Sequence, residues 1–494
     1  MIKINSLVLF LCALLTYTCS SAQQLLSLND VVQLAQKNSP SYYKARSNAL
    51  NSLYAYRYYA ASRRPQLKLQ ASNNSSFLGS TQSIQQPDGT FAFSRSSYSY
   101  SSLGITADQI VPLTGGQFSL ATNLQRNDVF DPTSDISYLS VPFSFNYVQP
   151  MILYNPYRWD KKIQPLLYEE SKKQYVEDLE QIALQSSDYF FNALATQQRE
   201  KILLQNVANT DTLYRISKGR YELGKIAENE LLQIELNLLN ARNNLEQATL
   251  SKEIAYRQLT QFLSMPKNSA ISVSLPDNVP ALQISVDSAQ KEALDNRQKV
   301  LSFRRQRLEA QQQVAQAKGN NGYELNLGAN FGQARQGNTF KQAYTGNSLQ
   351  QNQLLTVGVA IPIVDWGKAR NKIRQAKANQ ELVEIDVQQQ ERSFEQEIYL
   401  QTQQFNIQQK LFASAAKADT IAAQRYEITK QRYFIGKISI TDLNLAQQEK
   451  DQASQNYIDA LRGFWTAYYT VRQLTLYDFE RQAKIRYDFV ERGK

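Results

Sequence analysis

The chain has 494 residues, of which 42% are hydrophobic and 11% aromatic, and this composition is too aromatic for an intrinsically disordered protein. It contains no histidine, which excludes histidine-dependent hydrolysis and histidine-ligated zinc. The formal net charge is +10, but lysine and arginine are interspersed with acidic residues rather than clustered, so we expect no nucleic-acid partner.

The segment 1–22 is predicted to be an export signal. Lys3 precedes an apolar run over residues 7–15, and small residues follow at 20–22, which is the order found in secretory signal peptides. The only two cysteines, Cys12 and Cys19, lie in this segment. A buried N-terminal segment is one alternative. A lipoprotein is another, but the three residues before Cys19 lack the leucine and small side chains of a lipobox. Cleavage after residue 22 would leave a mature chain without cysteine.

The remainder of the chain contains an internal sequence repeat. In a first register Leu67 falls on Leu325, and in a second register the segment 220–226 falls on 432–438. Such self-similarity indicates repeated structure. We therefore predict a first repeat over 23–281 and a second over 282–494. The offsets of the two registers are 258 and 212, and the difference of 46 places an insertion of that size in the first repeat, between Ala71 and Pro150.

Each repeat begins with a helix and amphipathic strands. The pattern predicts a helix over 28–63, ended by Pro65, which cannot continue it. Alternating apolar and polar residues then predict a strand from Leu67 and a returning strand that ends at Pro150, with counterparts at 325–329 and 355–361. The insertion carries another candidate hairpin, 103–110 with 117–124, that either joins the sheet or caps it.

Two very long helices follow, at about 157–218 and 367–431, each roughly 95 Å long at 1.5 Å per residue. Such helices need a continuous partner, and the residues after each of them have heptad spacing. In the first repeat the predicted contact positions are Leu231, Ile234, Leu238, Ala241, Leu245 and Ala248. A soluble coiled-coil protein is the alternative, but it does not explain the export signal or the amphipathic strands.

The strands are the candidates for crossing a membrane, because no run reaches the roughly 18 apolar residues of a transmembrane helix. Four strands, or six with the inserted hairpin, are too few to close a barrel, and an open edge in lipid leaves backbone groups unpaired. We therefore expect several copies to share one barrel. Its polar strand faces would line a wet lumen, and Tyr154, Tyr157, Trp159 and Trp366 would form an aromatic belt.

The duplicated layout, the segment Asp365-Trp366-Gly367-Lys368-Ala369-Arg370 and the two Arg-Tyr-x-x-Gly turns resemble the TolC family of outer-membrane efflux proteins. The resemblance implies a mainly α-helical fold with a β-barrel contribution: duplicated long-helix hairpins and transmembrane strands, normally four per subunit, forming a TolC-like trimeric tunnel. It further implies a homotrimer in the outer membrane that extends into the periplasm, with a collar crossed by residues 265–281.

The resemblance also implies two sets of functional residues. The two turns match the periplasmic tips at which the adaptor protein of an inner-membrane pump docks. The alternative is that each is a plain structural turn between helices. The tip residues are Leu223, Gly224, Lys225, Ile435, Gly436 and Lys437. Glu230 and Asp442 match acidic residues that ring the tunnel entrance, and Tyr433 matches a tyrosine that latches it closed. Ile438 stands where the latch arginine is expected, so Lys437 pairing with Glu230 is a candidate substitute.

The sequence thus predicts an exit duct of a tripartite efflux or type I secretion system, without a cofactor or metal and in contact with outer-membrane lipid. An enzyme is disfavoured, because no G-x-x-x-x-G-K-[ST] phosphate loop occurs. A periplasmic coiled-coil scaffold would lack lipid-facing strands. The cargo, whether drug, metal or protein, and the class of pump cannot be read from the sequence.

Overall fold

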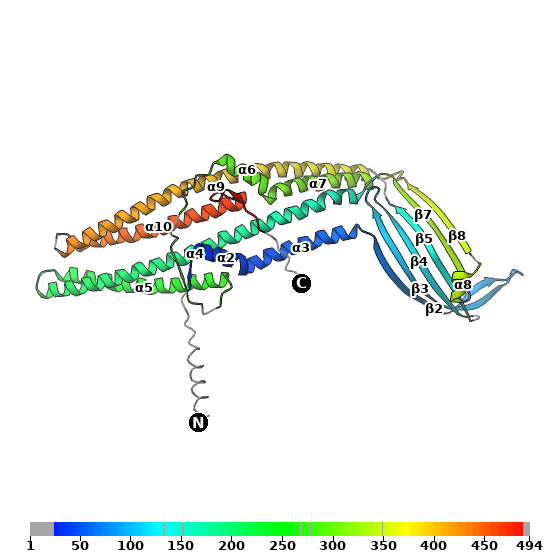
Figure 1. The fold of residues 1–494 in the computed structure, drawn as a ribbon, viewed down its shortest axis with the longest axis horizontal. Coiled ribbons are helices and arrows are strands. Elements are labelled where there is room, and N and C mark those ends of the chain that lie inside the picture. Colours follow the sequence, from blue (N-terminus) through cyan, green and yellow to red (C-terminus); the bar gives the residue numbers. More distant parts are fainter. Residues whose placement is uncertain are drawn as a thin grey trace, which may run out of the picture. The chain divides into compact units, whose positions relative to one another are not determined.

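The computed structural model describes residues 24–131, 134–150, 153–266, 269–276, 279–347, 349–435 and 437–487 (Figure 1). The predicted export signal lies outside these residues. The chain divides into two compact units, 1–50 with 171–300 and 392–494, and 51–170 with 301–391. Each unit draws on both halves of the sequence. The division of the sequence into repeats therefore stays a prediction about the chain, and the repeats do not coincide with the compact units.

The helices recur in the two registers found in the sequence. In the first register α6 and α7 repeat α2 and α3, and in the second α9 repeats α4, while α10 begins at the position that repeats the start of α5. The bounds are α2 Leu28–Asn38, α3 Pro40–Ser62, α4 Pro156–Glu222, α5 Glu228–Phe262, α6 Val286–Asn296, α7 Gln298–Asn320, α8 Phe340–Thr345, α9 Lys368–Phe434 and α10 Ile440–Thr475. The 67 residues of α4 and of α9 correspond to ~100 Å each.

The prediction of a single helix over 28–63 is wrong in one respect: the structure has two helices there, α2 and α3, separated at Ser39. Ser39 has extended backbone angles (φ −68°, ψ 151°). The hydroxyl of Ser39 accepts a hydrogen bond from the Tyr42 N–H at 3.1 Å, so it caps α3. Pro40 occupies the first helical position, where its missing N–H costs nothing. Arg297 marks the equivalent break between α6 and α7.

The sheet of the second unit has six antiparallel strands in the order β2-β3-β4-β5-β7-β8 (Figure 1). Their bounds are β2 Gln66–Gln85, β3 Phe91–Val111, β4 Gly116–Asp131, β5 Asp135–Gln149, β7 Glu324–Gly337 and β8 Leu349–Ala360. The inserted segment forms β3 and β4, whose register joins Val111 to Gly116. It therefore joins the sheet rather than capping it, which settles the alternative left open by the sequence.

The hydrophobic core of the first unit is formed by the middle of the long helices α4 and α9, by α10 and by short elements such as α2 and α6. The fully buried aromatic residues of this core are Phe190, Phe191, Phe394, Phe405 and Phe464. Two pairs of short strands belong to this unit: β1 Gln24–Leu26 with β6 Ile271–Val273, in parallel, and β9 Tyr477–Asp478 with β10 Ala483–Lys484, antiparallel. The described part of the predicted collar crossing at 265–281 thus pairs with the start of the described chain.

The heptad positions predicted in α5 all face inward. Ile234, Leu238 and Ala248 are buried, and Leu231, Ala241 and Leu245 are half-buried, while most of the residues between them are exposed. None of the helices among the described residues combines the length and the apolar composition needed to cross a membrane.

Candidate functional site

The turn between α4 and α5 is closed by a glycine in the left-handed region. Gly224 has φ +68°. Its N–H donates to the Tyr221 carbonyl at 2.8 Å, and the Lys225 N–H donates to the Arg220 carbonyl at 2.8 Å. These two bonds are those of a Schellman motif, which satisfies the last carbonyls of a helix. A side chain at Gly224 would meet no atom within 4 Å, so the position selects glycine for its backbone angle and not for lack of space.

The turn between α9 and α10 repeats one of these two hydrogen bonds. The Lys437 N–H donates to the Arg432 carbonyl at 3.0 Å, the bond that repeats Lys225 to Arg220. Gly436 lies outside the described residues, and its role at this turn remains a prediction. Leu223 and Ile435, at equivalent places in the two turns, are 76% and 66% exposed. Each turn therefore presents a bare apolar side chain at its outermost point.

The two predicted acidic residues differ in their surroundings. Asp442 forms a capping box with Ser439: its carboxylate accepts from the Ser439 hydroxyl at 2.8 Å and from the Ser439 N–H at 3.2 Å. Glu230 is preceded at the matching position by Ala227, which offers no hydroxyl. Among the described residues, no ion pair joins Glu230 to Lys437. Asp442 thus has a structural role at the start of α10 in addition to any role in conduction.

Tyr433 is buried rather than displayed at a surface, with 4% of its area exposed. It lies in an apolar cluster to which all four helices near the turns contribute: Leu213, Ile234, Tyr426, Tyr433, Ile440, Leu443 and Ala446. The ring therefore holds the hairpin α4–α5 against the hairpin α9–α10 by packing. A latch at Tyr433 stays a prediction, and the position of the ring between the two hairpins is compatible with it.

Three polar contacts between the same hairpins were not predicted from the sequence. Arg220 donates from Nη2 to the Phe434 carbonyl at 3.4 Å. Asn206 donates to a carboxylate oxygen of Asp451 at 2.5 Å, and Asn209 donates to the Tyr426 hydroxyl at 3.4 Å. The two partners of each contact come from different halves of the chain, so no local sequence pattern could reveal them. Together they join the hairpin α4–α5 to the hairpin α9–α10 within one copy.

Burial raises the pKa of two groups in these contacts. The pKa of Asp451 is raised by burial, against the opposing effect of the Asn206 hydrogen bond. Burial also raises the pKa of the Tyr426 hydroxyl to about 12. The Lys450 ammonium lies 4.7 Å from the centre of the Tyr426 ring, within the range of a cation–π contact. The region is therefore partly desolvated, and its hydrogen bonds are stronger than they would be in water.

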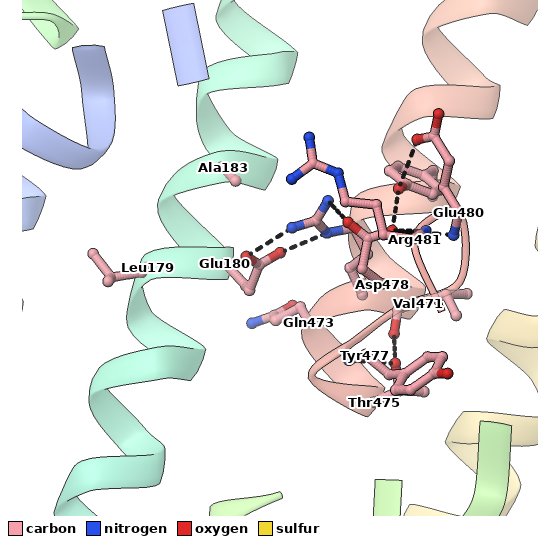
Figure 2. A network of polar contacts seen from close by, with 12 residues as sticks. Leu179, Glu180, Ala183, Val471, Gln473, Thr475, Tyr477, Asp478, Glu480 and Arg481 are labelled. Carbon is pink, nitrogen blue, oxygen red and sulfur yellow. Dashed lines mark hydrogen bonds and ion pairs between the residues drawn. The ribbon is translucent and has the colours of Figure 1, made fainter. Parts of the chain in front are cut away.

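A second polar network lies in the core of the first unit, where Figure 2 shows Glu180 of α4 facing the end of α10 and the loop with Asp478. Arg472 forms a two-point contact with the Glu180 carboxylate, at 3.0 and 3.2 Å, and a further bond to Asp478 at 3.1 Å. Tyr487 donates to Glu180 at 2.8 Å. Glu180 is completely buried, and the network binds the C-terminal tail to the first half of the chain.

Asp365, in the segment just before α9, caps the start of this helix. The Asp365 carboxylate accepts from the Gly367 N–H at 2.8 Å and from the Ala369 N–H at 2.9 Å. These bonds lower the pKa of Asp365, since they stabilise its charged form. Trp366 and Gly367 both have positive φ, and the Trp366 ring is 94% exposed. The aromatic belt stays a prediction, and the exposure of Trp366 is compatible with it.

The fold thus combines a six-stranded antiparallel sheet with two helices of 67 residues. Residues 289–475 match the family model described as outer membrane efflux protein. No curated protein sequence matches the chain. Residues 289–475 thus match the outer membrane efflux protein family, in agreement with the resemblance to the TolC family, and this family consists of channels rather than enzymes.

Solved structures support the same fold over nearly the whole chain. The CmeC outer membrane channel of Campylobacter jejuni is 17% identical, with a TM-score of 0.65 over 94% of this chain and 87% of that one. The outer-membrane channel OprN is 16% identical, with a TM-score of 0.64 over 91% and 89% of the two chains. The outer membrane protein VceC of Vibrio cholerae is 13% identical, with a TM-score of 0.62 over 91% and 95%.

Proposed function

We propose that the protein is the exit duct of a tripartite efflux or secretion system. In this function cargo leaves an inner-membrane pump, enters the duct through a periplasmic adaptor and diffuses through a wet tunnel to the outside. The observation that carries the proposal is the exposed apolar face of the six-stranded sheet, because a surface of this kind needs lipid or a partner to cover it. The pump supplies the energy, and the duct supplies the path.

The working form is proposed to be a homotrimer in the outer membrane that extends into the periplasm. A single sheet of six strands has two open edges, and open edges are not tolerated in lipid. Fractionation tests this form directly. We expect heat-modifiable trimers in the outer-membrane fraction, and a soluble periplasmic monomer would instead support a coiled-coil scaffold.

The two turns are proposed to dock the adaptor. Their exposed residues Leu223 and Ile435 offer apolar contact, and Lys225 and Lys437 offer positive charge beside them. Both bonds of a Schellman motif close the turn at Gly224, and the Lys437 N–H repeats one of them in the second turn. An exposed apolar point that is held by backbone hydrogen bonds is suited to fit a groove on a partner, because less conformational entropy is lost on binding.

The acidic residues are proposed to set the ion selectivity of the entrance. In a trimer Glu230 and Asp442 would each occur three times, and rings of carboxylates attract cations. We expect the double variant Glu230→Gln/Asp442→Asn to lower the cation-over-anion permeability ratio severalfold in planar bilayers and to alter the single-channel conductance. Unchanged currents would remove both residues from the entrance.

The capping role of Asp442 requires its own control. Ser439→Ala removes the hydroxyl that bonds Asp442, at a cost of about 1 kcal/mol to the helix start, and keeps the charge. We expect this variant to retain the selectivity of the unmodified channel. If Ser439→Ala reproduces the change seen in the double variant, the effect arises from the helix start and not from the charge ring.

A further inference from the structure

The two halves of the chain contribute unequally to the sheet. The second half supplies β7 and β8, and the first half supplies β2 to β5. The difference is the hairpin β3–β4, residues 91–131, which we call the inserted hairpin. It lies between β2 and β5, which would otherwise be the strands equivalent to β7 and β8. The question is whether it is a part of the membrane wall or an accessory to it.

The apolar face of the sheet continues into the inserted hairpin. Residues directly opposite on antiparallel strands share a face. One such row crosses five strands and consists of Leu67, Ala107, Leu120, Phe145 and Phe331. Its leucines and phenylalanines are all exposed, from 77% at Leu67 to 38% at Phe145. The inserted strands thus show to the outside the same kind of surface as the strands on either side.

Polar contacts also join the inserted hairpin to β2. The Lys68 ammonium of β2 lies 3.0 Å from a carboxylate oxygen of Asp108 on β3. The other oxygen of Asp108 accepts a hydrogen bond of 2.7 Å from Ser119 on β4. This chain of three residues joins β2 to both strands of the inserted hairpin. An accessory flap would not need polar contacts with its neighbours on the side opposite the apolar row.

The turn of the inserted hairpin is held by the residues that connect the sheet to α4. Asn155 donates to the Pro112 carbonyl at 2.8 Å, and Gln149 donates to the Thr114 carbonyl at 2.9 Å. Gly116 lies so close to Tyr147 that a Cβ there would be 2.5 Å from the hydroxyl. The turn is therefore fixed in the plane of the sheet, at the end of the strands where α4 begins.

The outer strands of the sheet, β2 and β8, are open edges that run in opposite directions, because five antiparallel pairings separate them. About half of the residues of an edge strand direct their N–H and C=O groups away from the sheet. For the 12 residues of β8 this leaves about six of each group, at several kcal/mol per unpaired group in lipid. An antiparallel edge of opposite direction is what β2 of another copy offers to β8.

We propose that β8 of one copy pairs with β2 of the next and that the inserted hairpin is part of the closed wall, so that three copies form an 18-stranded barrel. The proposal rests on the proposed function, and it departs from the four strands per subunit that the TolC resemblance implies. Barrel diameter grows roughly in proportion to strand number, and barrels of 16–18 strands enclose an aqueous channel. The outer mouth is then ~1.5 times as wide as that of a 12-stranded barrel.

Cysteine cross-linking tests the proposed contact between copies. The chain's only cysteines, Cys12 and Cys19, lie in the predicted export signal, so introduced pairs have no competitor in the mature chain. Leu67, Leu69 and Ala71 of β2 are each replaced by cysteine and combined with a cysteine at Leu355, Val357 or Val359 of β8, all on the apolar face. We expect at least one combination to give an oxidant-dependent ladder of dimers and trimers.

A control pair inside one copy verifies that the sheet is folded. Ala107→Cys and Leu120→Cys stand directly opposite each other on β3 and β4 and should form a bond within the monomer. If this control bond forms but no β2–β8 combination cross-links, the proposed contact between copies is wrong.

A deletion tests whether the inserted hairpin belongs to the wall. Removing residues 91–131 leaves β2 and β5 as antiparallel neighbours with their apolar residues on the same face. In planar bilayers, neutral polyethylene glycols of graded size are added to the barrel side, and the largest one that enters and lowers the conductance is determined. We expect the threshold radius to fall ~1.5-fold in the deletion variant. An equal threshold in both proteins would overturn the proposal.

The outcomes separate this proposal from the proposed function. Intact protein that forms no channel in bilayers contradicts the exit duct itself. A channel with an unchanged polymer threshold keeps the exit duct and removes the inserted hairpin from the wall. If the deletion variant does not assemble, a cross-link between β4 and β5 in the full-length protein tests whether the inserted hairpin belongs to the wall. A bond between Leu120→Cys and Phe145→Cys in the assembled trimer supports the hairpin in the wall, and its failure to form contradicts it.

Discussion

Replacing Arg472 by alanine should lower the free energy of unfolding by about 3–5 kcal/mol, because it leaves a buried carboxylate without its cation. Glu180 has no exposed surface, and Arg472 supplies two of its hydrogen bonds. The same substitution also removes the bond to Asp478. Equilibrium urea unfolding of the detergent-solubilised protein, followed by circular dichroism, measures the loss.

Arg257→Ala is the matched control for this prediction. Arg257 also forms a two-point contact, with Glu253, but the two side chains are 77% and 57% exposed. A pair of this kind contributes at most about 1 kcal/mol. Equal losses of stability in the two variants would show that burial does not strengthen the Arg472 network, against the account given above.

Gly224→Val should reduce export to background while trimers still assemble. A β-branched residue at φ +68° costs roughly 1–2 kcal/mol, so the turn is expected to change shape rather than to unfold the helices. The exposed point formed by Leu223 and Lys225 would then move away from its partner. Export is measured as cellular resistance or as secretion of cargo, and assembly is measured by heat-modifiable trimers on gels.

Gly219→Ala serves as its control within the same helix. Gly219 has ordinary helical angles and open space around it, so alanine should be tolerated and export should continue. Gly436→Val makes the equivalent change in the second turn. Normal export by both the Gly224 and the Gly436 variants would count against docking at these turns.

Much of the fold follows from the sequence because its signals are local or periodic. The two registers, read from a few matches such as Leu67 with Leu325, recur in the bounds of α2, α3 and α4 and in the start of α5. The long helices were identified by their lack of proline beyond the first turns, where Pro165 lies, and by the heptad spacing of the residues that follow them. The break at Ser39 was missed, although Ser39-Pro40 is a capping residue followed by proline, because the apolar pattern continues across it.

Other features depend on partners that are distant in the chain. Hydrophobic alternation showed that the inserted segment forms a hairpin, but not that its neighbours would be β2 and β5, since pairing depends on the whole sheet. The parallel pairing of β1 with β6 joins residues that lie far apart in the sequence, such as Gln24 and Ile271. For the site, the turns were located correctly by the repeat, whereas the burial of Tyr433 and the capping role of Asp442 required the packed structure.

The central claim is that one copy supplies only part of the membrane wall, so several copies must complete it. Native mass spectrometry of the detergent-extracted protein tests this claim most directly. We expect a single dominant species of three chains, resistant to dilution, that conducts ions when reconstituted in planar bilayers. A conducting species that contains one chain, with β2 and β8 paired within that chain, would contradict the account.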